Sequence, residues 1–160
     1  MLLASFQIEV SHGQFSVFCS SIPNPFNDWT DEHVSQGFSW RPGSVSFRTV
    51  CESGLHCVHV EAGNERTELC PSAVRVIEVP FDVPDDGAVE VGGIPGTVSL
   101  SLPAGRYELR CEFDREQHDN TSAVLLRFLR NDAPGFRVLR ADDALSPPQE
   151  LVKNASPAGC

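Results

Sequence analysis

Residues 97–113 decide the fold class, and they read Thr97-Val98-Ser99-Leu100-Ser101-Leu102-Pro103-Ala104-Gly105-Arg106-Tyr107-Glu108-Leu109-Arg110-Cys111-Glu112-Phe113. Apolar and polar side chains alternate on both sides of the Pro-Ala-Gly segment. A period of two places apolar side chains on one face of an extended strand and polar ones on the other. The stretch therefore predicts two half-buried antiparallel strands, with a hairpin turn at residues 103–105.

The same alternation recurs along most of the chain. It predicts further strands at residues 6–10, 14–17, 44–48, 55–61, 72–81, 88–91, 123–129 and 136–140. Within 72–81 the phase slips between Val76 and Ile77, which favours a β-bulge there. Many short strands at this spacing are typical of an all-β, antiparallel β-sandwich.

One short stretch departs from the strand pattern and predicts a helical insertion at residues 30–37. Thr30 is suited to cap its first turn, the acidic residues that follow favour the positive end of the helix dipole, and Gly37 suits a left-handed exit. We expect residues 1–141 to form the β-sandwich domain. Residues 142–160 are polar and Pro-rich, so we expect a loosely ordered C-terminal tail.

The charge balance limits the choice of partner. Twelve Lys and Arg stand against 22 Asp and Glu in 160 residues, which gives a net charge of −10. Such a surface repels nucleic acid and anionic membranes, so we expect no direct contact with either. The first six residues lack the basic region of an export signal. We therefore expect a cytoplasmic protein whose six cysteines are reduced thiols.

The segment 51–59 contains the residue types that bind zinc. Thiolates and imidazoles are good ligands for this metal, but the spacing of Cys51, His56, Cys57 and His59 matches no standard zinc motif. On a strand, Cys57 and His59 share one face while His56 points to the other. Most cysteines fall in expected strands, and none opens a helix that would activate its thiol. We expect no metal, no cofactor and no catalytic residue, and hence no enzyme.

A calcium site is the alternative that the acidic residues leave open. Asp82, Asp85 and Asp86, with Asp142 and Asp143 near the chain end, would have to gather at one rim of the sandwich, because calcium takes six to eight oxygen ligands. In the structural interpretation, the Asp-Asp-Gly segment is a solvated turn. A calcium- or ligand-binding β-sandwich adaptor is thus the alternative function. The glycine-rich loop 91–96 precedes a strand rather than a helix, which argues against phosphate binding.

An acidic and aromatic segment, residues 25–47, offers a different kind of site. It contains both tryptophans of the chain and the acidic residues Asp28, Asp31 and Glu32. In the structural interpretation, Trp29 and Trp40 cover one open end of the sandwich. In the functional one, the segment is a contact surface, because Trp is enriched among interface anchors and acidic residues select a basic partner.

The same segment resembles the competence protein J (ComJ) family, known as the inhibitor of the DNA-entry nuclease. The resemblance is carried by the runs Asp28-Trp29-Thr30-Asp31-Glu32, Gly37-Phe38 and Gly43-Ser44-Val45-Ser46-Phe47, and more weakly by residues 14–18, 79–81 and 100–109. It spans residues 6–113. The Cys51 to His59 stretch and the Pro-rich tail match no pattern of that family.

The resemblance implies a non-enzymatic inhibitor that binds a DNA-degrading nuclease. A nuclease presents a basic groove to its substrate, and an acidic protein that mimics phosphate charge can occlude that groove. The partner is then a basic nuclease. The residues expected to contact it are Asp28, Trp29, Asp31, Glu32, Asp85 and Asp86.

Overall fold

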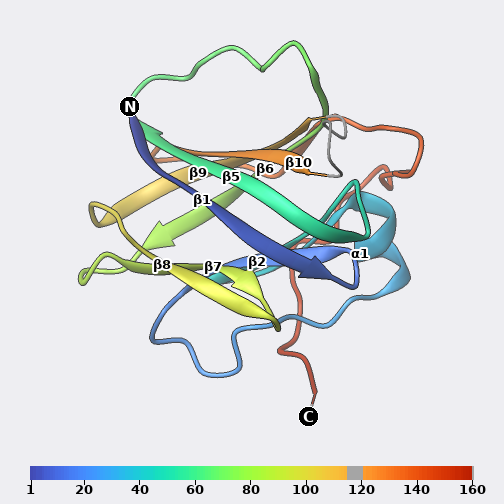
Figure 1. Ribbon diagram of the computed structural model, residues 1–160, viewed down its shortest axis with the longest axis horizontal. Helices are drawn as coiled ribbons and strands as arrows, with labels where there is room; N and C mark the ends of the chain where they lie inside the picture. Colours follow the sequence, from blue (N-terminus) through green and yellow to red (C-terminus); the bar gives the residue numbers. More distant parts are fainter. Residues whose placement is uncertain (115–120, 160) are drawn as a thin grey trace.

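The computed structural model describes residues 1–114 and 121–159, which form two β-sheets packed face to face (Figure 1). The six-stranded sheet has the order β1-β5-β10-β9-β6-β11, with strands β1 Leu2–Ser11, β5 Ser53–Gly63, β10 Ser122–Arg130, β9 Gly105–Asp114, β6 Ala73–Val83 and β11 Arg137–Arg140. The five-stranded sheet has the order β3-β4-β2-β7-β8, with strands β3 Phe38–Arg41, β4 Ser44–Arg48, β2 Gln14–Cys19, β7 Ala88–Gly93 and β8 Gly96–Ser101. The all-β sandwich is confirmed.

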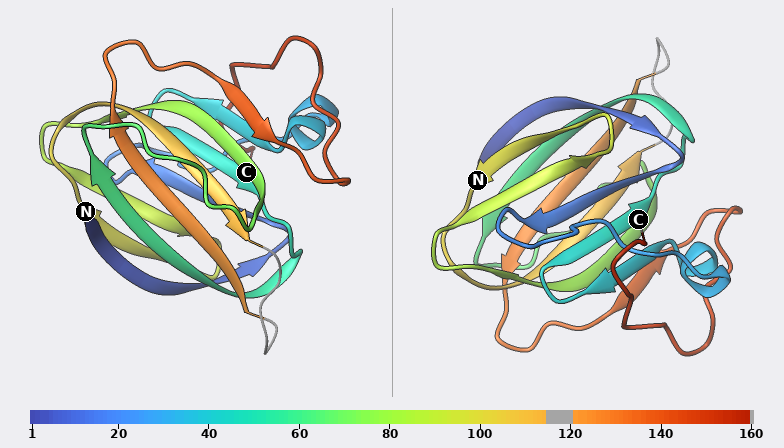
Figure 2. Two further views of the ribbon diagram at one scale, coloured as in Figure 1. Left: turned by 90° about the horizontal axis from the view of Figure 1, so that it is seen from above. Right: turned by 90° about the horizontal axis from the view of Figure 1, so that it is seen from below.

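The core lies between the inner faces of the two sheets. Alternate residues of each strand point inward, as the period of two predicts. Phe15 of β2 contacts Phe47 of β4 and reaches across to Phe113 of β9, at ring-centroid distances of 5.7 and 6.0 Å. Seen from above, the larger sheet lies in front of the smaller one, and seen from below the smaller sheet lies in front; in both views the helix lies beside them (Figure 2).

The helical insertion is confirmed as α1, Asp31–Gln36. Thr30 is its N-cap and accepts a hydrogen bond from the main-chain N–H of His33. Gly37 follows with φ of 91°, the left-handed conformation that favours glycine. An added Cβ there would lie 3.0 Å from Ile77 and from Leu145, so packing also restricts this position.

The predicted hairpin at residues 103–105 is wrong. β8 pairs with β7 in the smaller sheet, whereas β9 pairs with β6 and β10 in the larger one. The Pro-Ala-Gly segment therefore carries the chain from one sheet to the other. Tyr107 fixes this crossing, because its hydroxyl donates to the carbonyl of Pro103 at 2.7 Å. The hairpin turn in this region is instead the glycine-rich loop, where Gly93 pairs with Gly96.

Three further details of strand pairing differ from the sequence pattern. β10 runs parallel to β5, while every other pairing of named strands is antiparallel. Against β9 the register of β6 is continuous through Val76 and Ile77, with an irregularity between Ala73 and Arg75. Against β11 a register shift does fall at Val76 and Ile77, where the extra residue is in β11, between Val138 and Arg140. β3 was not expected as a strand. Its pattern is obscured because both faces of its first half are buried.

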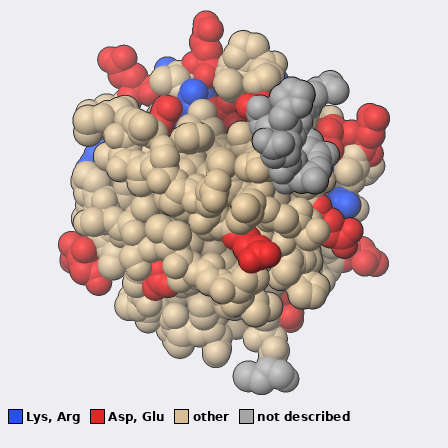
Figure 3. All heavy atoms as spheres, viewed as in Figure 1, with Lys and Arg blue, Asp and Glu red and all other residues tan. Residues whose placement is uncertain are grey.

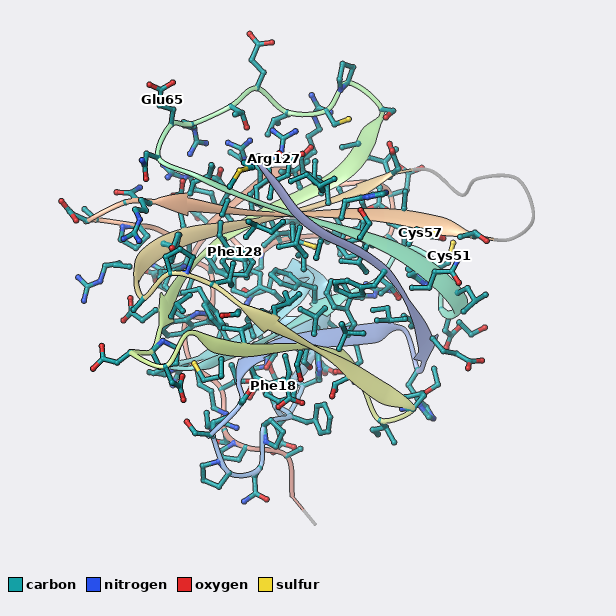
Figure 4. The ribbon with its side chains drawn as sticks, turned by 60° about the vertical axis from the view of Figure 1, so that its left-hand side comes forward. Phe18, Cys51, Cys57, Glu65, Arg127 and Phe128 are labelled. Atoms are coloured by element: carbon teal, nitrogen blue, oxygen red, sulfur yellow. The ribbon has the colours of Figure 1, made fainter. Side chains whose placement is uncertain are left out.

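The outer face of β9 is polar but not open to solvent, contrary to the expected half-buried strand. Glu108, Arg110 and Glu112 are each at most 2% exposed. The loop 64–72 covers them, and Arg66 from this loop pairs with Glu108 at 2.6 Å. In Figure 4, Arg127 of β10 points towards the loop that carries Glu65, while the next residue, Phe128, points into the core.

The C-terminal segment, expected to be loosely held, lies against α1 and the segment before it. Gln36 contacts Val152 through two hydrogen bonds of 2.9 Å, one to its carbonyl and one from its N–H. Ser146 donates to the carbonyl of Ser35, and Leu145 is buried. The division into a β-sandwich domain at residues 1–141 and a loosely ordered tail at residues 142–160 remains a prediction.

Candidate functional site

Trp29 and the first turn of α1 form the candidate site, which we call the α1 surface: Asp28, Trp29, Asp31 and Glu32. The turn is held by reciprocal hydrogen bonds in which Thr30 accepts from His33, and Nδ1 of His33 accepts from the main-chain N–H of Thr30 at 3.0 Å. Nε2 of His33 therefore carries the proton and donates to the carbonyl of Asn154 at 3.0 Å. His33 is buried and structural, and it fixes the position of the acidic turn.

Trp29 is anchored rather than free. Its indole N–H donates to Oε1 of Gln14 at 2.7 Å, and its ring stands at 87° to that of His33. It is half-buried and borders a pocket of about 440 Å³ that Arg48, Glu52 and His12 also line. A rigid, half-buried indole next to a pocket is a suitable interface anchor, because little side-chain entropy remains to be lost on binding.

Asp28, Asp31 and Glu32, the acidic residues within three positions of Trp29 in the chain, are exposed. The main chain of Asp28 is held by two contacts, its N–H to the carbonyl of Ser156 at 2.9 Å and its carbonyl to the hydroxyl of Ser39 at 2.6 Å. The backbone is thus fixed while the three negative charges face solvent. Such a group attracts a basic protein over a distance of about 10 Å at ordinary ionic strength.

Asp85 and Asp86 lie at the other end of the smaller sheet. They lie in the turn that joins the end of β6 to the start of β7. The end of β2 is close to this turn, because the main-chain N–H of Ser20 donates to the carbonyl of Ala88, the first residue of β7. Trp29 contacts the opposite end of β2 through Gln14. The length of β2 separates the two ends by about 17 Å, at roughly 3.4 Å per residue. The predicted contact residues therefore form two groups, not one.

The thiol of Cys19 marks the second group. Burial raises its pKa, and the nearby carboxylates of Asp86 and Asp82 raise it further. A raised pKa keeps the thiol protonated at neutral pH, which makes it a poor nucleophile.

The two tryptophans lie at different places on the sandwich. The indole N–H of Trp40 donates to the carbonyl of Pro80 at 2.7 Å, and Trp40 borders a different pocket from Trp29. They do not cover the same end of the sandwich.

On the face seen in Figure 3, acidic side chains are scattered at the rim and near the middle, with wide uncharged areas between them. Part of the acidic content is not on the surface at all. Glu78 is fully buried, and Glu108 and Glu112 lie beside it beneath the loop 64–72. Burial alone would raise the pKa of Glu78, but hydrogen bonds from Arg110 and Arg66 outweigh it and lower that pKa. On this face the acidic residues thus do not form one continuous patch.

The aspartates considered for calcium are not brought together. Asp142 is held by Arg75 through bonds of 2.7 and 3.0 Å, near the beginning of β6. Asp82 lies near the far end of the same strand and pairs with Arg106 at 3.2 Å. The gathering at one rim that a calcium site would require is therefore not found for these aspartates, since β6 holds the two groups apart.

The cysteine- and histidine-rich stretch supplies no assembled site in the part of the chain that the structure describes. His56 faces the core, while Cys57 and His59 lie on the opposite face of β5, as the alternation predicts. Burial lowers the pKa of His56, whose Nδ1 lies 3.1 Å from the carbonyl of Gly54. Among residues 1–114 and 121–159, no group of three or more His, Cys, Asp or Glu could hold a metal ion. Over the same ranges, no helix is both long and apolar enough to span a bilayer.

Sequence reasoning missed two residues of the site. Gln14 was read only as a polar position of a strand, yet it orients Trp29. Ile94, at the tip of the β7–β8 hairpin, is 80% exposed and lines an apolar pocket of about 250 Å³ together with Phe26 and Gln14. The signal available in the sequence was the apolar residue in the loop run Gly92-Gly93-Ile94-Pro95-Gly96.

These features define the class: a two-sheet β-sandwich that exposes an aromatic and acidic surface beside a short capped helix. The family model of competence protein J (ComJ) matches residues 7–129, and the chain belongs to that family. It is similar to a DNA-entry nuclease inhibitor of Bacillus subtilis (strain 168), with 28% identity over 105 residues that cover 66% of this chain and 77% of the relative.

Two solved structures share the fold. One is the crystal structure of ComJ from Bacillus subtilis, described as the inhibitor of the DNA-degrading activity of NucA. It matches with a TM-score of 0.68 and 21% identity over 82% of this chain and 98% of that one. The other is the product of crocagin biosynthetic gene J, with a TM-score of 0.54 and 15% identity over 81% of this chain and 97% of that one.

Proposed function

We propose that this protein binds a DNA-degrading nuclease and inhibits it, and that it performs no covalent chemistry itself. The observation that carries the proposal is the relationship to the DNA-entry nuclease inhibitor of Bacillus subtilis, over two thirds of the chain. Family membership over residues 7–129 includes the whole α1 surface.

The proposed mechanism is occlusion of the nuclease's basic substrate groove by the α1 surface. In this mechanism the carboxylates of Asp28, Asp31 and Glu32 take the place of DNA phosphate groups, and the indole of Trp29 is the anchor. Opposite charges steer the two proteins together and raise the association rate. The exposed side chain of Ile94 borders the pocket next to Gln14 and provides an apolar contact at the edge of this surface.

The experiment measures DNA degradation by a purified nuclease with increasing amounts of this protein. The first nuclease to test is NucA of Bacillus subtilis, and the second is any nuclease found to be encoded beside the gene of this protein. We expect degradation to stop near an equimolar ratio, and a complex to elute from a sizing column. Undiminished activity of both nucleases in excess protein, without a complex, would refute the proposal.

A ligand-binding adaptor is the second candidate. The observation in its favour is the apolar pocket of about 250 Å³ between Phe26, Ile94 and Gln14, which is the right kind of lining for a small apolar ligand. Ligand binding to the native state must raise the melting temperature. A thermal-shift screen of small apolar compounds on the wild type and on Ile94→Asp tests it; a compound that stabilises only the wild type would support this function.

A further inference from the structure

A second surface of the molecule, which shares no residue with the α1 surface, is a groove between the two sheets. Its volume is about 520 Å³. The residues that matter for its chemistry are Trp40, Pro42, Pro80, Pro84, Asp132 and Pro134. We call it the Trp40 groove. It brings together four segments of the chain: β3 with its following turn, the end of β6, the start of β9, and the connection from β10 to β11.

The wall of the Trp40 groove is rigid. The indole N–H of Trp40 donates to the carbonyl of Pro80 at 2.7 Å, and the ring meets Phe136 edge to face at 4.9 Å. Prolines have a fixed φ and no side-chain freedom to lose. A partner that binds here therefore orders few groups of this protein, which favours binding. Because the indole N–H is already bonded, the groove offers a partner an aromatic surface rather than a hydrogen-bond donor.

The charges around the Trp40 groove are mostly negative. Asp82 and Asp132 line it, and Asp85 and Asp86 follow directly after Pro84. Arg106 also lines it, but pairs with Asp82 at 3.2 Å. The neighbouring Arg130 lies 5.1 Å from the ring centre of Tyr107 and donates to the carbonyl of Ala104.

Asp132 is the carboxylate that remains available. It is exposed, and within residues 1–114 and 121–159 it has no ion-pair partner. The turn around Asp132 is held by the residues on either side of it, because the main-chain N–H of Ala133 donates to Oδ1 of Asn131 at 2.9 Å. The groove thus combines an aromatic wall with an unpaired carboxylate, and a planar cation fits both.

We propose that the Trp40 groove receives an arginine side chain from a protein partner, with the guanidinium against Trp40 and paired with Asp132. Guanidinium is planar and weakly hydrated, stacks on aromatic rings and binds carboxylates through two parallel hydrogen bonds. An ammonium group is more strongly hydrated and gains less from the indole. The inference rests on the proposed function in one respect: the partner that carries the arginine is the nuclease.

The first experiment needs no nuclease. The probes are acetyl-glycyl-arginyl-glycine amide and the same peptide with citrulline, which has the shape of arginine without its charge. The two indole N–H signals in a ¹H–¹⁵N spectrum report on the two surfaces separately, and Trp29→Phe assigns them. We expect the arginine peptide to shift the Trp40 signal and not the Trp29 signal, and the citrulline peptide to shift neither.

The matched variants are Asp132→Asn and Asp143→Asn, which remove one exposed carboxylate each, in the groove and away from it. Asp132→Asn is expected to lower the affinity for the arginine peptide by about threefold, the size typical of an exposed ion pair. Asp143→Asn is expected to leave this affinity unchanged. A Trp40 signal that stays in place at millimolar peptide, or equal effects of the two variants, would overturn the proposal. So would a dimer of this protein that buries Trp40.

The second experiment adds the nuclease and keeps the two proposals apart. If the nuclease is inhibited and the Trp40 signal is perturbed in the complex, both proposals stand. If it is inhibited while the Trp40 signal is unperturbed, the groove is not part of that interface and the inference is overturned. If no nuclease binds but the arginine peptide does, the proposed function fails and the groove remains an arginine site for another partner.

Discussion

Arg110 donates from Nε to Oε2 of Glu78 at 2.8 Å, and neither side chain is more than 1% exposed. The two residues lie opposite each other on β9 and β6. Glu78 also binds Arg66 and Arg137, and Arg110 also donates to the carbonyl of Thr67 in the covering loop. The pair is thus the centre of an ionic network that attaches the loop 64–72 to the larger sheet.

Arg110→Leu should destabilise the protein by about 3 kcal/mol, because the buried carboxylate of Glu78 loses its fully buried arginine partner. Arg106→Leu is the matched control on the same strand, since Arg106 and Asp82 form an exposed pair. Its cost should be at most about 1 kcal/mol. Urea unfolding measures both. Equal losses of unfolding free energy in the two variants would show that burial of the network does not matter.

His56 should make the protein sensitive to mild acid. Its imidazole is fully buried, and burial lowers its pKa below the ordinary value of 6.5. Just below pH 6.5, His56 therefore binds a proton in the unfolded chain and stays neutral in the folded one. The stabilisation by the neutral imidazole of His56 is therefore fully present above pH 6.5. As the pH falls below 6.5, the free energy of unfolding decreases by up to about 1.4 kcal/mol per pH unit.

His56→Leu removes this titration, so its unfolding free energy should change less with pH just below 6.5 than that of the wild type. Glu78 and Asp142 also have lowered pKa values, but their ordinary values are 4.5 and 3.8. Their loss of stabilisation begins at lower pH and is separate. Parallel stability curves for the wild type and His56→Leu between neutral pH and pH 5 would contradict this account.

Gln36→Leu should release the C-terminal segment from α1. The variant loses both hydrogen bonds to Val152, at a cost of about 2 kcal/mol. We expect the amide of Val152 to exchange its hydrogen faster and proteases to cleave within residues 146–159. Gln149→Leu is the control, because Gln149 is exposed in the same segment. Rapid exchange at Val152 already in the wild type would mean that the segment is loosely held, as the sequence suggested.

The α1 surface can be separated from the Asp85–Asp86 turn by charge removal at each. If the α1 surface steers the nuclease, Asp31→Asn with Glu32→Gln should lower the association rate by about tenfold at low salt. The difference from the wild type should shrink as salt screens the charges. Asp85→Asn with Asp86→Asn removes the same charge at the other end of the smaller sheet. A larger effect of this second pair would move the main contact towards the Trp40 groove.

The sequence by itself determined the elements other than β3, and the direction of their side chains. A strand's pleat sends neighbouring residues to opposite faces, so alternation at Leu109 and Arg110 fixes which side chain enters the core without knowledge of any partner strand. The start of α1 is equally local, because the cap Thr30 and the residue His33 that completes it lie within one turn. Such features depend on residues close in the chain, and they were predicted correctly.

Only the tertiary structure decided which strands are neighbours. Alternation is the same for a strand in either sheet, so the crossing at Pro103 looked like a hairpin, and nothing in β10 signalled its parallel pairing with β5. The tertiary structure also covered the charges of β9 with a distant loop and placed Asp31 and Asp86 at opposite ends of one sheet. These outcomes depend on contacts between residues far apart in sequence, which no local pattern encodes.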